Sequence, residues 1–387
     1  MPLLFLTDFY PPGFRSGGPA RSCYNLSVGL SSHTSVRVLT RDRDLGSPLP
    51  YPAIPTNTWT SFVSGVKVAY LSPAQQGFWF IIRWVKQSPG AVLYLNSMFS
   101  LPFTIYPLLA IKLGLIRGRV VLAPRGMLKA SALQFKPLKK KIFLALFKAL
   151  GWHRFIVFQA SSGAEAKDIS RVFGSSVQVV TCPPVPEIAL MSSRVVHHRS
   201  TGVTRFCIIG RIHPIKNMHE ALELLAFAES PVQVDVIGPF EDAAYYARCQ
   251  SIVRQLPATV QVHFHGALPI AETHDLLRQT DFFYLLTQGE NFGHAIFEAL
   301  ALGKPVIISD QTPWRQLPDN QAGWDLSLQN KVSIQQALKH AIEMDDGEYQ
   351  AWSEGAFAHV QAYVAESDWL AAYRDLFFPG GEFASTT

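Results

Sequence analysis

The stretch that decides the fold runs from Glu290 to Ser309 and reads ENFGHAIFEALALGKPVIIS. Its apolar residues recur at helical spacing between Gly293 and Leu302, and Gly303 stands where a helix would stop. The preceding run, Asp281 to Thr287, is short, apolar and rich in aromatic residues, as expected for a strand buried on both faces of a parallel sheet. Another apolar run opens at Pro305. The stretch therefore predicts a strand, a loop, a helix and a second strand of an α/β sheet.

Two glutamates fall within this stretch, Glu290 in the loop and Glu298 on the helix. A helix that begins at a strand's carboxyl end directs its free N–H groups and positive dipole end into the crevice where open α/β sheets bind ligands. Glu298 is placed to accept from the vicinal hydroxyls of a ribose, and Glu290 from sugar hydroxyls. Alternatively, both are solvated charges beside an ordinary helix. The pair, together with Phe292-Gly293 and the following strand, favours a sugar-nucleotide site.

A second strand-and-loop pattern lies upstream, from Thr204 to Asn217. An apolar strand there leads into Gly210, whose missing side chain permits close approach of a ligand. Two cations follow in the loop: Arg211 can fork onto phosphate oxygens, and Lys216 adds a mobile point charge. An amphipathic helix is expected from about Asn217 to Ala228. A surface arginine and lysine near a turn are common, so this loop alone is weak evidence for a phosphate site. The evidence becomes stronger when the loop is taken together with Glu290 and Glu298.

Together the two patterns resemble the retaining glycosyltransferases of family 4, the glycosyl transferases group 1, over nearly the whole chain. The resemblance implies the α/β architecture called GT-B, in which two Rossmann-like, doubly wound parallel-sheet domains face a cleft. The resemblance implies that Arg211 and Lys216 bind the donor diphosphate. It also implies that Glu298 binds the ribose and that Glu290, with its loop, contacts the donor sugar. The residues expected to be catalytic are Arg211, Lys216 and Glu290. Those expected to bind the donor or another substrate are Gly17, Gly18, Arg125, Gly210, Asn291, Phe292, Gly293, His294 and Glu298. His294 either contacts donor phosphate or sugar, or packs at the helix start.

The amino-terminal half fits the same architecture. A first strand is expected at Leu3–Thr7, then a loop rich in glycine and proline, and then a helix from Pro19 to Leu30. Gly17 and Gly18 in this loop resemble the family's paired glycines, which let the backbone approach donor phosphate or acceptor, although such pairs suit any tight turn. Helical stretches separate several further strands, which is a doubly wound pattern. These strands are expected at Ser35–Thr40, Val66–Leu71, Ala91–Asn96, Arg119–Ala123, Phe155–Gln159 and Val177–Thr181.

Two positions depart from the family pattern. Pro124-Arg125-Gly126 resembles a sub-pattern of bacterial enzymes that build cell-surface polysaccharide, but many members place a histidine near this point. Arg125 either neutralises charge or binds donor sugar or acceptor, or it is a structural guanidinium that ties two loops together. Trp314 lies where many relatives have a glycine pair before Pro-Glu; it either stacks on a base or sugar or plugs the core.

The segment 136–150 combines five lysines with a strongly apolar remainder. It is expected to be either an amphipathic helix resting on an anionic membrane surface or a core-packed helix with a solvated basic end. The stretch from Phe99 to Ile116 is also very apolar, but prolines, a lysine and a glycine interrupt it. No transmembrane span is therefore expected.

Length and composition set the remaining limits. A chain of 387 residues suits two domains, expected at 1–184, completed by a carboxyl-terminal helix within 366–387, and at 185–365. The net charge of +5 is modest and no arginine-rich stripe with interleaved aromatics occurs, so no nucleic-acid partner is expected. Four scattered cysteines and a start without a basic leader favour a cytoplasmic protein, with peripheral contact to the inner face of the cytoplasmic membrane as an addition.

The resemblance implies transfer of a sugar from a UDP- or GDP-sugar to a glycan or a polyprenyl-diphosphate-linked acceptor, with retention of anomeric configuration. The pathway would be O-antigen, capsule or exopolysaccharide biosynthesis. No metal and no cofactor are expected, because cations and helix N–H groups can stabilise a departing diphosphate; the nearest acidic motif, Asp42-Arg-Asp44, is expected in a loop. A hydrolysing sugar-nucleotide epimerase and a non-catalytic scaffold subunit of a polysaccharide assembly complex remain alternatives.

Overall fold

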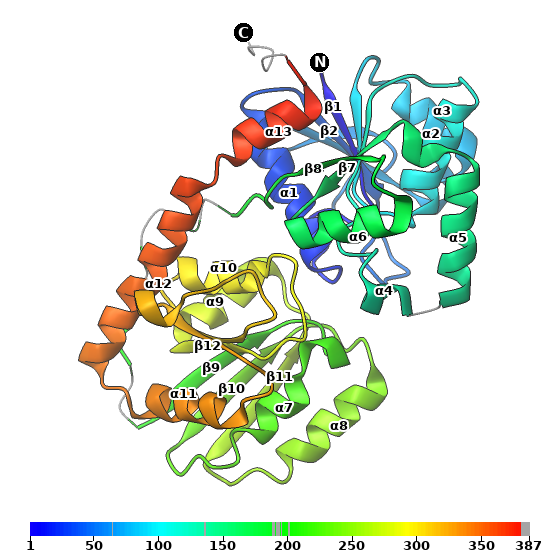
Figure 1. Cartoon of the computed structure of the whole chain (residues 1–387). Helices are drawn as coiled ribbons and strands as arrows, with labels where there is room; N and C mark the ends of the chain where they lie inside the picture. Colours follow the sequence, from blue (N-terminus) through cyan, green and yellow to red (C-terminus); the bar gives the residue numbers. More distant parts are fainter. Residues whose placement is uncertain are drawn as a thin grey trace. The chain divides into compact units, whose positions relative to one another are not determined.

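The computed structural model describes residues 1–63, 65–134, 137–187, 190, 194, 196–199 and 202–380. These residues form two compact units (Figure 1). Unit 1 comprises the chain up to Val185 and from Asp368 onward, and unit 2 comprises Pro186–Ser367. Lys136, the first residue of the expected basic helix, and residues 381–387 of the expected carboxyl-terminal helix lie outside the described residues.

Unit 1 is built on an eight-stranded sheet in the order β3-β4-β2-β1-β5-β6-β7-β8. The seven strands expected in this half of the chain are confirmed, and all of them run parallel. The eighth, β3, was not predicted because its residues are exposed or half-buried and form no apolar run; it pairs antiparallel with β4 at the sheet edge. The strands are β1 (Leu3–Leu6), β2 (Val36–Arg41), β3 (Trp59–Val63), β4 (Val66–Leu71), β5 (Val92–Leu95), β6 (Val120–Leu122), β7 (Ile156–Ala160) and β8 (Gln178–Thr181).

Apolar layers cover both faces of this sheet, because successive strand side chains point to opposite faces. Leu4 and Leu6 pack with the helices α2, α3, α5 and α6, whereas Leu3 and Phe5 pack with α1 and α13. The last helix that the structure describes, α13, thereby belongs to the core of unit 1. The helices are α1 (Gly18–Ser31), α2 (Phe78–Val85), α3 (Tyr106–Lys112), α4 (Ala130–Gln134), α5 (Pro137–Ala149), α6 (Gly163–Phe173) and α13 (Trp369–Phe377).

Unit 2 is built on a six-stranded, wholly parallel sheet in the order β11-β10-β9-β12-β13-β14. The strands predicted near Thr204, Asp281 and Pro305 are confirmed as β9, β12 and β13, while β10, β11 and β14 were not singled out from the sequence. The strands are β9 (Thr204–Ile209), β10 (Val232–Ile237), β11 (Val260–Gly266), β12 (Phe282–Leu285), β13 (Val306–Ser309) and β14 (Gly323–Leu326).

The helices of unit 2 lie on both faces of its sheet. Figure 1 shows α7 and α8 on one face and α9 and α10 on the other. This arrangement follows from the chain path, because the connection from β11 to β12 crosses back over β10 and β9. The helices are α7 (Met218–Glu223), α8 (Ala243–Val253), α9 (Ile270–Gln279), α10 (His294–Ala301), α11 (Lys331–Glu343) and α12 (Asp346–Glu366).

Two predicted helices have different bounds in the structure. The helix expected up to Ala228 ends at Glu223, and the chain continues in tighter turns, with Leu225 N–H bonded to the Leu222 carbonyl and Ala228 N–H to that of Leu225. The helix expected from Glu366 begins only at Trp369. Asp368 caps it by accepting from the Ala371 N–H at 3.0 Å.

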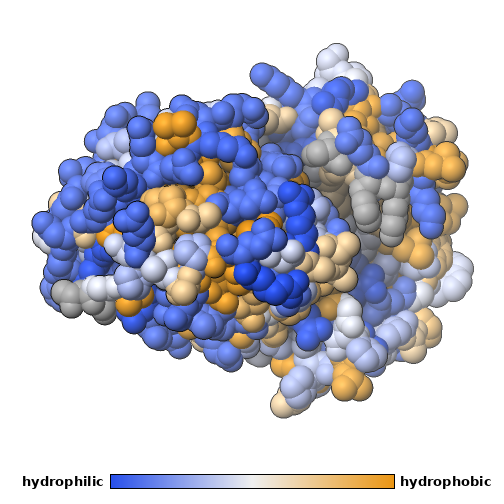
Figure 2. Space-filling model, turned by 90° about the horizontal axis from the view of Figure 1, so that it is seen from below, coloured by the Kyte–Doolittle hydropathy of each residue, from blue (hydrophilic) through white to orange (hydrophobic). Residues whose placement is uncertain are grey.

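No helix in the described part of the chain is long and apolar enough to cross a membrane. The face shown in Figure 2 mixes hydrophilic and hydrophobic residues, and its hydrophobic residues gather in several separate small groups.

Candidate functional site

The candidate site lies in unit 2, at the point where the strand order reverses. The chain runs from β9 outward through β10 to β11 and then returns to β12 on the other side of β9. The loops that follow β9 and β12 therefore leave adjacent strands in opposite directions, and such a divergence is where open α/β sheets bind ligands. The first loop carries Arg211 and Lys216, and the second carries Glu290.

Backbone hydrogen bonds hold the loops of this edge together. Gln288 N–H donates to the Ile215 carbonyl at 2.8 Å, which joins the loop after β12 to the loop after β9. Glu290 N–H donates to the Gln311 carbonyl at 3.0 Å, which adds the loop after β13. Three consecutive strands of the sheet thus present one connected rim.

Lys216 and Glu290 meet on this rim. The Lys216 ammonium donates to Glu290 Oε1, and the two side chains are only 14% and 16% exposed. Gly210 makes room for the lysine, because a Cβ at that position would lie 3.3 Å from the Lys216 side chain. Seventy-four residues separate the two charges in sequence, so the fold brings together two residues that were expected to share one site.

Arg211 is more exposed to solvent than Lys216. Its guanidinium forms an ion pair with Glu241 at 2.6 Å, and both side chains are about two-fifths exposed. The loop after β10 is held against the Arg211 loop by a bridge between Ile212 and Phe240. A phosphate could replace Glu241 at low cost, because an exposed ion pair of this kind contributes only about 0–1 kcal/mol.

The loop of Asn291, Phe292 and Gly293 leads directly into α10. Gly293 is the N-cap residue with φ of 79°, a left-handed conformation in which a side chain would also lie 2.8 Å from Ile296. His294 follows, and its ring lies 4.9 Å from that of Phe292. The first turn of α10 therefore directs backbone N–H groups toward the rim.

Trp314 holds the loop of Asn291, Phe292 and Gly293 by a hydrogen bond to its backbone. It is 3% exposed, and its indole N–H donates to the Phe292 carbonyl at 2.6 Å. Its ring packs against Phe297 and, from α12, Tyr363. Of the two alternatives for this residue, the structure therefore shows a core side chain that also bonds the backbone of the loop.

Glu298 is buried beside a histidine that sequence reasoning missed. Both Glu298 and His274, on α9, are 5% exposed, and Glu298 Oε2 lies 3.2 Å from His274 Nε2. Glu187 adds a second carboxylate: one ligand atom from each residue lies within 4.8 Å of the others, a set that could also hold a metal ion. No spacing in the sequence could reveal this cluster, because it joins α9, α10 and the linker between β8 and β9.

The remaining candidate residues lie in unit 1. Gly17, with φ of 69°, is the N-cap of α1, and Gly18 is the first residue of that helix. A Cβ at Gly17 would meet nothing within 4 Å. The acidic motif Asp42-Arg-Asp44 shapes the same loop, since Asp44 Oδ2 accepts from the backbone N–H groups of Phe14 and Arg15 at 2.9 and 3.2 Å.

Arg125 lies in the loop after β6 and bonds to two neighbours. Its Nε donates to Asn96 Oδ1 at 2.8 Å, and its NH2 donates to the Tyr94 hydroxyl at 2.6 Å. Burial raises the pKa of Tyr94 well above its ordinary value, so the hydroxyl stays neutral and donates onward to Gln159 at 3.0 Å. The guanidinium thus ties the loop after β6 to β5 and the loop that follows it.

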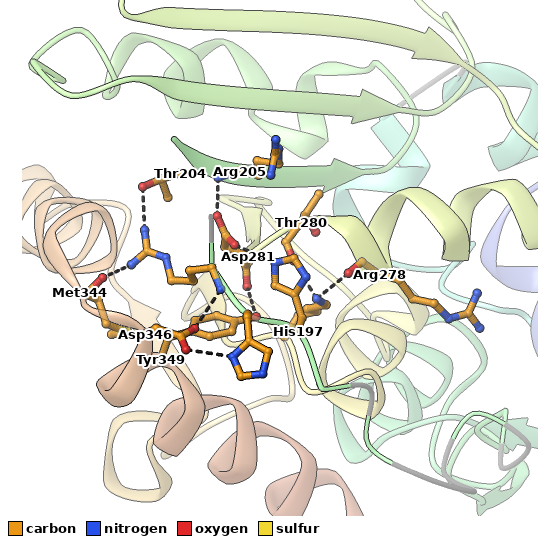
Figure 3. A network of polar contacts seen from close by, with 12 residues as sticks. His197, Thr204, Arg205, Arg278, Thr280, Asp281, Met344, Asp346 and Tyr349 are labelled. Carbon is orange, nitrogen blue, oxygen red and sulfur yellow. Dashed lines mark hydrogen bonds and ion pairs between the residues drawn. The ribbon is translucent and has the colours of Figure 1, made fainter. Parts of the chain in front are cut away.

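A second polar network lies at the amino ends of the unit 2 strands, just before β12 (Figure 3). Asp281 is fully buried there and accepts from His197 at 2.9 Å and from the Arg205 N–H at 2.7 Å. Lys304, also fully buried, donates to the carbonyls of Arg278 and Thr280 at 2.8 Å each. Burial lowers the pKa of this lysine to about 7, although Asp281 opposes the shift.

The same network fastens the linker segment 197–199 to the start of α12. His198 and the Arg199 N–H both bond to Asp346 at 2.9 Å, and the hydrogen bond with His198 lowers the pKa of that carboxyl to about 2. The Arg199 guanidinium donates to the Met344 carbonyl and, at 2.7 Å, to Thr204. These contacts stabilise unit 2 and lie away from the rim that carries Lys216.

Comparisons with known proteins agree with this picture. Residues 192–358 match the family model of glycosyl transferases group 1. No curated protein matches the sequence. Among solved structures, sucrose-phosphate synthase from Thermosynechococcus elongatus is similar with a TM-score of 0.70 and 16% identity, over 97% of this chain and 99% of that one.

Two other solved structures are similar over almost their full length. WaaG, a glycosyltransferase involved in lipopolysaccharide biosynthesis, has a TM-score of 0.65 and 15% identity over 98% of this chain and 100% of its own. Anabaena Alr3699/HepE, in complex with UDP and glucose, has a TM-score of 0.67 and 15% identity over 97% and 98%. The chain thus has the GT-B fold, and its residues 192–358 match the model of the glycosyl transferases group 1 family.

Proposed function

We propose that this protein transfers a sugar from a nucleoside-diphosphate sugar to a glycan or lipid-linked acceptor, with retention of anomeric configuration and without a metal. The contact between Lys216 and Glu290 at the switch point of unit 2 carries the proposal. In this proposal Lys216 would bind the diphosphate and Glu290 the sugar, and both lie inside the segment that matches the glycosyltransferase family model.

The chemistry follows from the charges on the rim. As the bond between sugar and diphosphate breaks, negative charge develops on the leaving phosphate. Lys216 and Arg211 supply positive charge there, and the amino end of α10 adds oriented N–H groups. Arg211 would leave Glu241 to do so. Retention would follow if the acceptor attacked from the face that the diphosphate leaves, with a phosphate oxygen taking the acceptor's proton.

The donor and acceptor classes are proposed from the relatives. HepE is described in complex with UDP and glucose, and WaaG is described as acting in lipopolysaccharide biosynthesis. We therefore propose a UDP- or GDP-sugar as donor and, as acceptor, a glycan or polyprenyl-diphosphate-linked precursor of a cell-surface polysaccharide. Arg125 ties the loop after β6 to Tyr94 and Asn96 in unit 1. We propose that it thereby holds the loops that bind the acceptor.

Peripheral membrane contact is proposed for α5. Within Pro137–Ala149 only Phe147 is buried, whereas Leu138, Ile142 and Leu146 are 70%, 53% and 57% exposed. These three recur every four residues and so line one side of the helix. Lys139 and Lys141 are one position from the stripe's first and second members and flank it, a pattern that suits an anionic membrane surface.

Binding and product analysis test the transferase. The purified protein is screened by thermal shift against UDP, GDP, ADP and CMP without divalent metal, and a selective rise in melting temperature is expected with one nucleoside diphosphate. With the matching sugar donor and a glycan acceptor, NMR of the product reports the anomeric configuration. Release of free nucleotide without an acceptor would instead support the epimerase, and no binding at all would support the scaffold.

A separate assay tests the membrane contact. Flotation with vesicles that contain anionic lipid is expected to carry the wild-type protein, and vesicles of neutral lipid are expected to carry much less. Replacing Leu138, Ile142 and Leu146 by serine should abolish flotation without lowering thermal stability, because these side chains are exposed. Replacing the exposed Val332 of unit 2, which is 63% exposed, by serine is the matched control and should change nothing.

A further inference from the structure

The carboxylate of Glu298 is held by α9 as well as by its own helix. Glu298 lies in the second turn of α10 and His274 in the second turn of α9, and both are 5% exposed. Glu298 Oε2 and His274 Nε2 are 3.2 Å apart. Two helices on the same face of the sheet thus fix one oxygen of this carboxylate.

The direction of this hydrogen bond follows from chemistry. An ionised carboxylate can only accept, so His274 Nε2 must carry the hydrogen and donate it to Oε2. A carboxylate has roughly four acceptor positions, more than a single histidine can fill. Adjacent hydroxyls, as on a ribose, need two such positions in a fixed orientation. A carboxylate whose rotation is restrained by a hydrogen bond offers that orientation at a lower entropic cost.

We propose that His274 is a positioning residue that orients Glu298 to receive the ribose hydroxyls, and that this pair makes the site select ribonucleotides over 2′-deoxyribonucleotides. The inference rests on the proposed function, since it needs a nucleoside diphosphate in unit 2. Glu187, whose carboxylate lies within 4.8 Å of both partners, extends the cluster to the segment in which the chain passes from unit 1 into unit 2.

A second buried histidine–carboxylate pair in the same unit provides a matched control. His197 Nε2 lies 2.9 Å from Asp281 Oδ1, with side-chain exposures of 16% and 0%. This pair belongs to the network of Figure 3, at the amino end of β12, opposite the rim that carries Lys216. Its loss would affect the stability of unit 2 without touching the proposed ribose position.

The experiment compares the affinity of the full-length protein for UDP and for 2′-deoxy-UDP, or for the GDP pair if GDP binds more tightly. A hydrogen bond to a charged group corresponds to a ratio of roughly 10 to 100, so wild type is expected to prefer the ribonucleotide by about tenfold or more. His274→Leu should reduce the preference to below about threefold while leaving 2′-deoxy-UDP binding unchanged. His274→Gln, which keeps an N–H donor, should recover part of it, and His197→Gln should match wild type.

Each outcome decides a different point. If no nucleoside diphosphate binds wild type, the proposed function fails and the inference fails with it. If wild type binds both nucleotides equally well, nucleotide binding still supports the proposed function but Glu298 does not read the ribose. A full preference in His274→Leu would remove His274 from the positioning role. A preference that appears only with added Zn²⁺ or Mn²⁺ and vanishes with chelator would make the cluster a metal site and overturn the proposal.

Discussion

Replacing Trp314 by phenylalanine isolates the hydrogen bond that holds the loop before α10 at Phe292. Trp314 is 3% exposed, and its N–H reaches the Phe292 carbonyl at 2.6 Å. Phenylalanine keeps an aromatic ring among the same neighbours but removes the donor. A buried acceptor left without its partner costs about 1–3 kcal/mol, and the smaller ring adds a packing loss of about 1 kcal/mol. We therefore expect the free energy of unfolding to fall by about 2–4 kcal/mol.

The function should change more than the stability alone explains. The freed carbonyl lies next to Gly293 and two residues after Glu290, so the loop between them loses a fixed point. We expect kcat/KM to fall by about tenfold or more under conditions in which the variant is still folded, as checked by urea unfolding and by steady-state assays.

The control for this prediction is Trp324→Phe. Trp324 is 9% exposed and its ring stacks on that of Trp352, with the centroids 4.2 Å apart, rather than on Phe292. It should lose stability by packing but keep its kcat/KM. If the two variants show the same activity at equal loss of stability, Trp314 does not position the loop and the reasoning is refuted.

Three further predictions concern charges and thiols. Lys216→Met should weaken binding of the nucleoside diphosphate, and the loss should be smaller in a Glu290→Gln background; equal losses in calorimetry would show that the pair is not coupled. The folded chain releases the Lys304 proton above about pH 7, whereas the unfolded chain keeps it to about 10.5. The unfolding free energy of wild type should therefore rise relative to Lys304→Met by about 1.4 kcal/mol per pH unit between these values, and a constant difference would contradict the buried charge. Burial raises the pKa of Cys249 from 9.0 to about 11, so its share of the stability is present below pH 9 and lost as the pH rises through 11. All four thiols are buried and should react with Ellman's reagent only after unfolding.

The strands of the fold could be predicted where burial on both faces requires a continuous run of apolar residues. β12 and β13 are continuous apolar runs because both faces of each strand are covered. The edge strand β3 left no such pattern, since none of its residues is fully buried. The end of α7 was also missed, because apolar residues continue at helical spacing through Leu225 while the backbone tightens into turns.

The candidate site divides in the same way. The loops that carry Lys216 and Glu290 could be located from the sequence, because each follows a predicted strand and precedes a predicted helix. Their contact depends on β9 and β12 being neighbours. Periodicity does not reveal this pairing, and the family resemblance implied only that the two loops share one donor site. The roles of these residues in binding a donor remain predictions. His274 and Glu187 could not be found, because their closeness to Glu298 depends on how α9 packs beside α10 and on where the linker runs.

The discontinuous make-up of unit 1 has a consequence for synthesis on the ribosome. Unit 2 is one continuous segment and can complete its core as soon as α12 has been made. Unit 1 cannot, because Tyr373, Leu376 and Phe377 of α13 are buried in the same core as Leu3 and Phe5 of β1, the first strand to be made. Most of unit 1 is therefore translated before unit 2, but its core is completed after that of unit 2. Until α13 has been made, the apolar residues that pack against it remain exposed. A nonsense mutation just before Trp369 should therefore leave unit 2 folded and prevent unit 1 from completing its core.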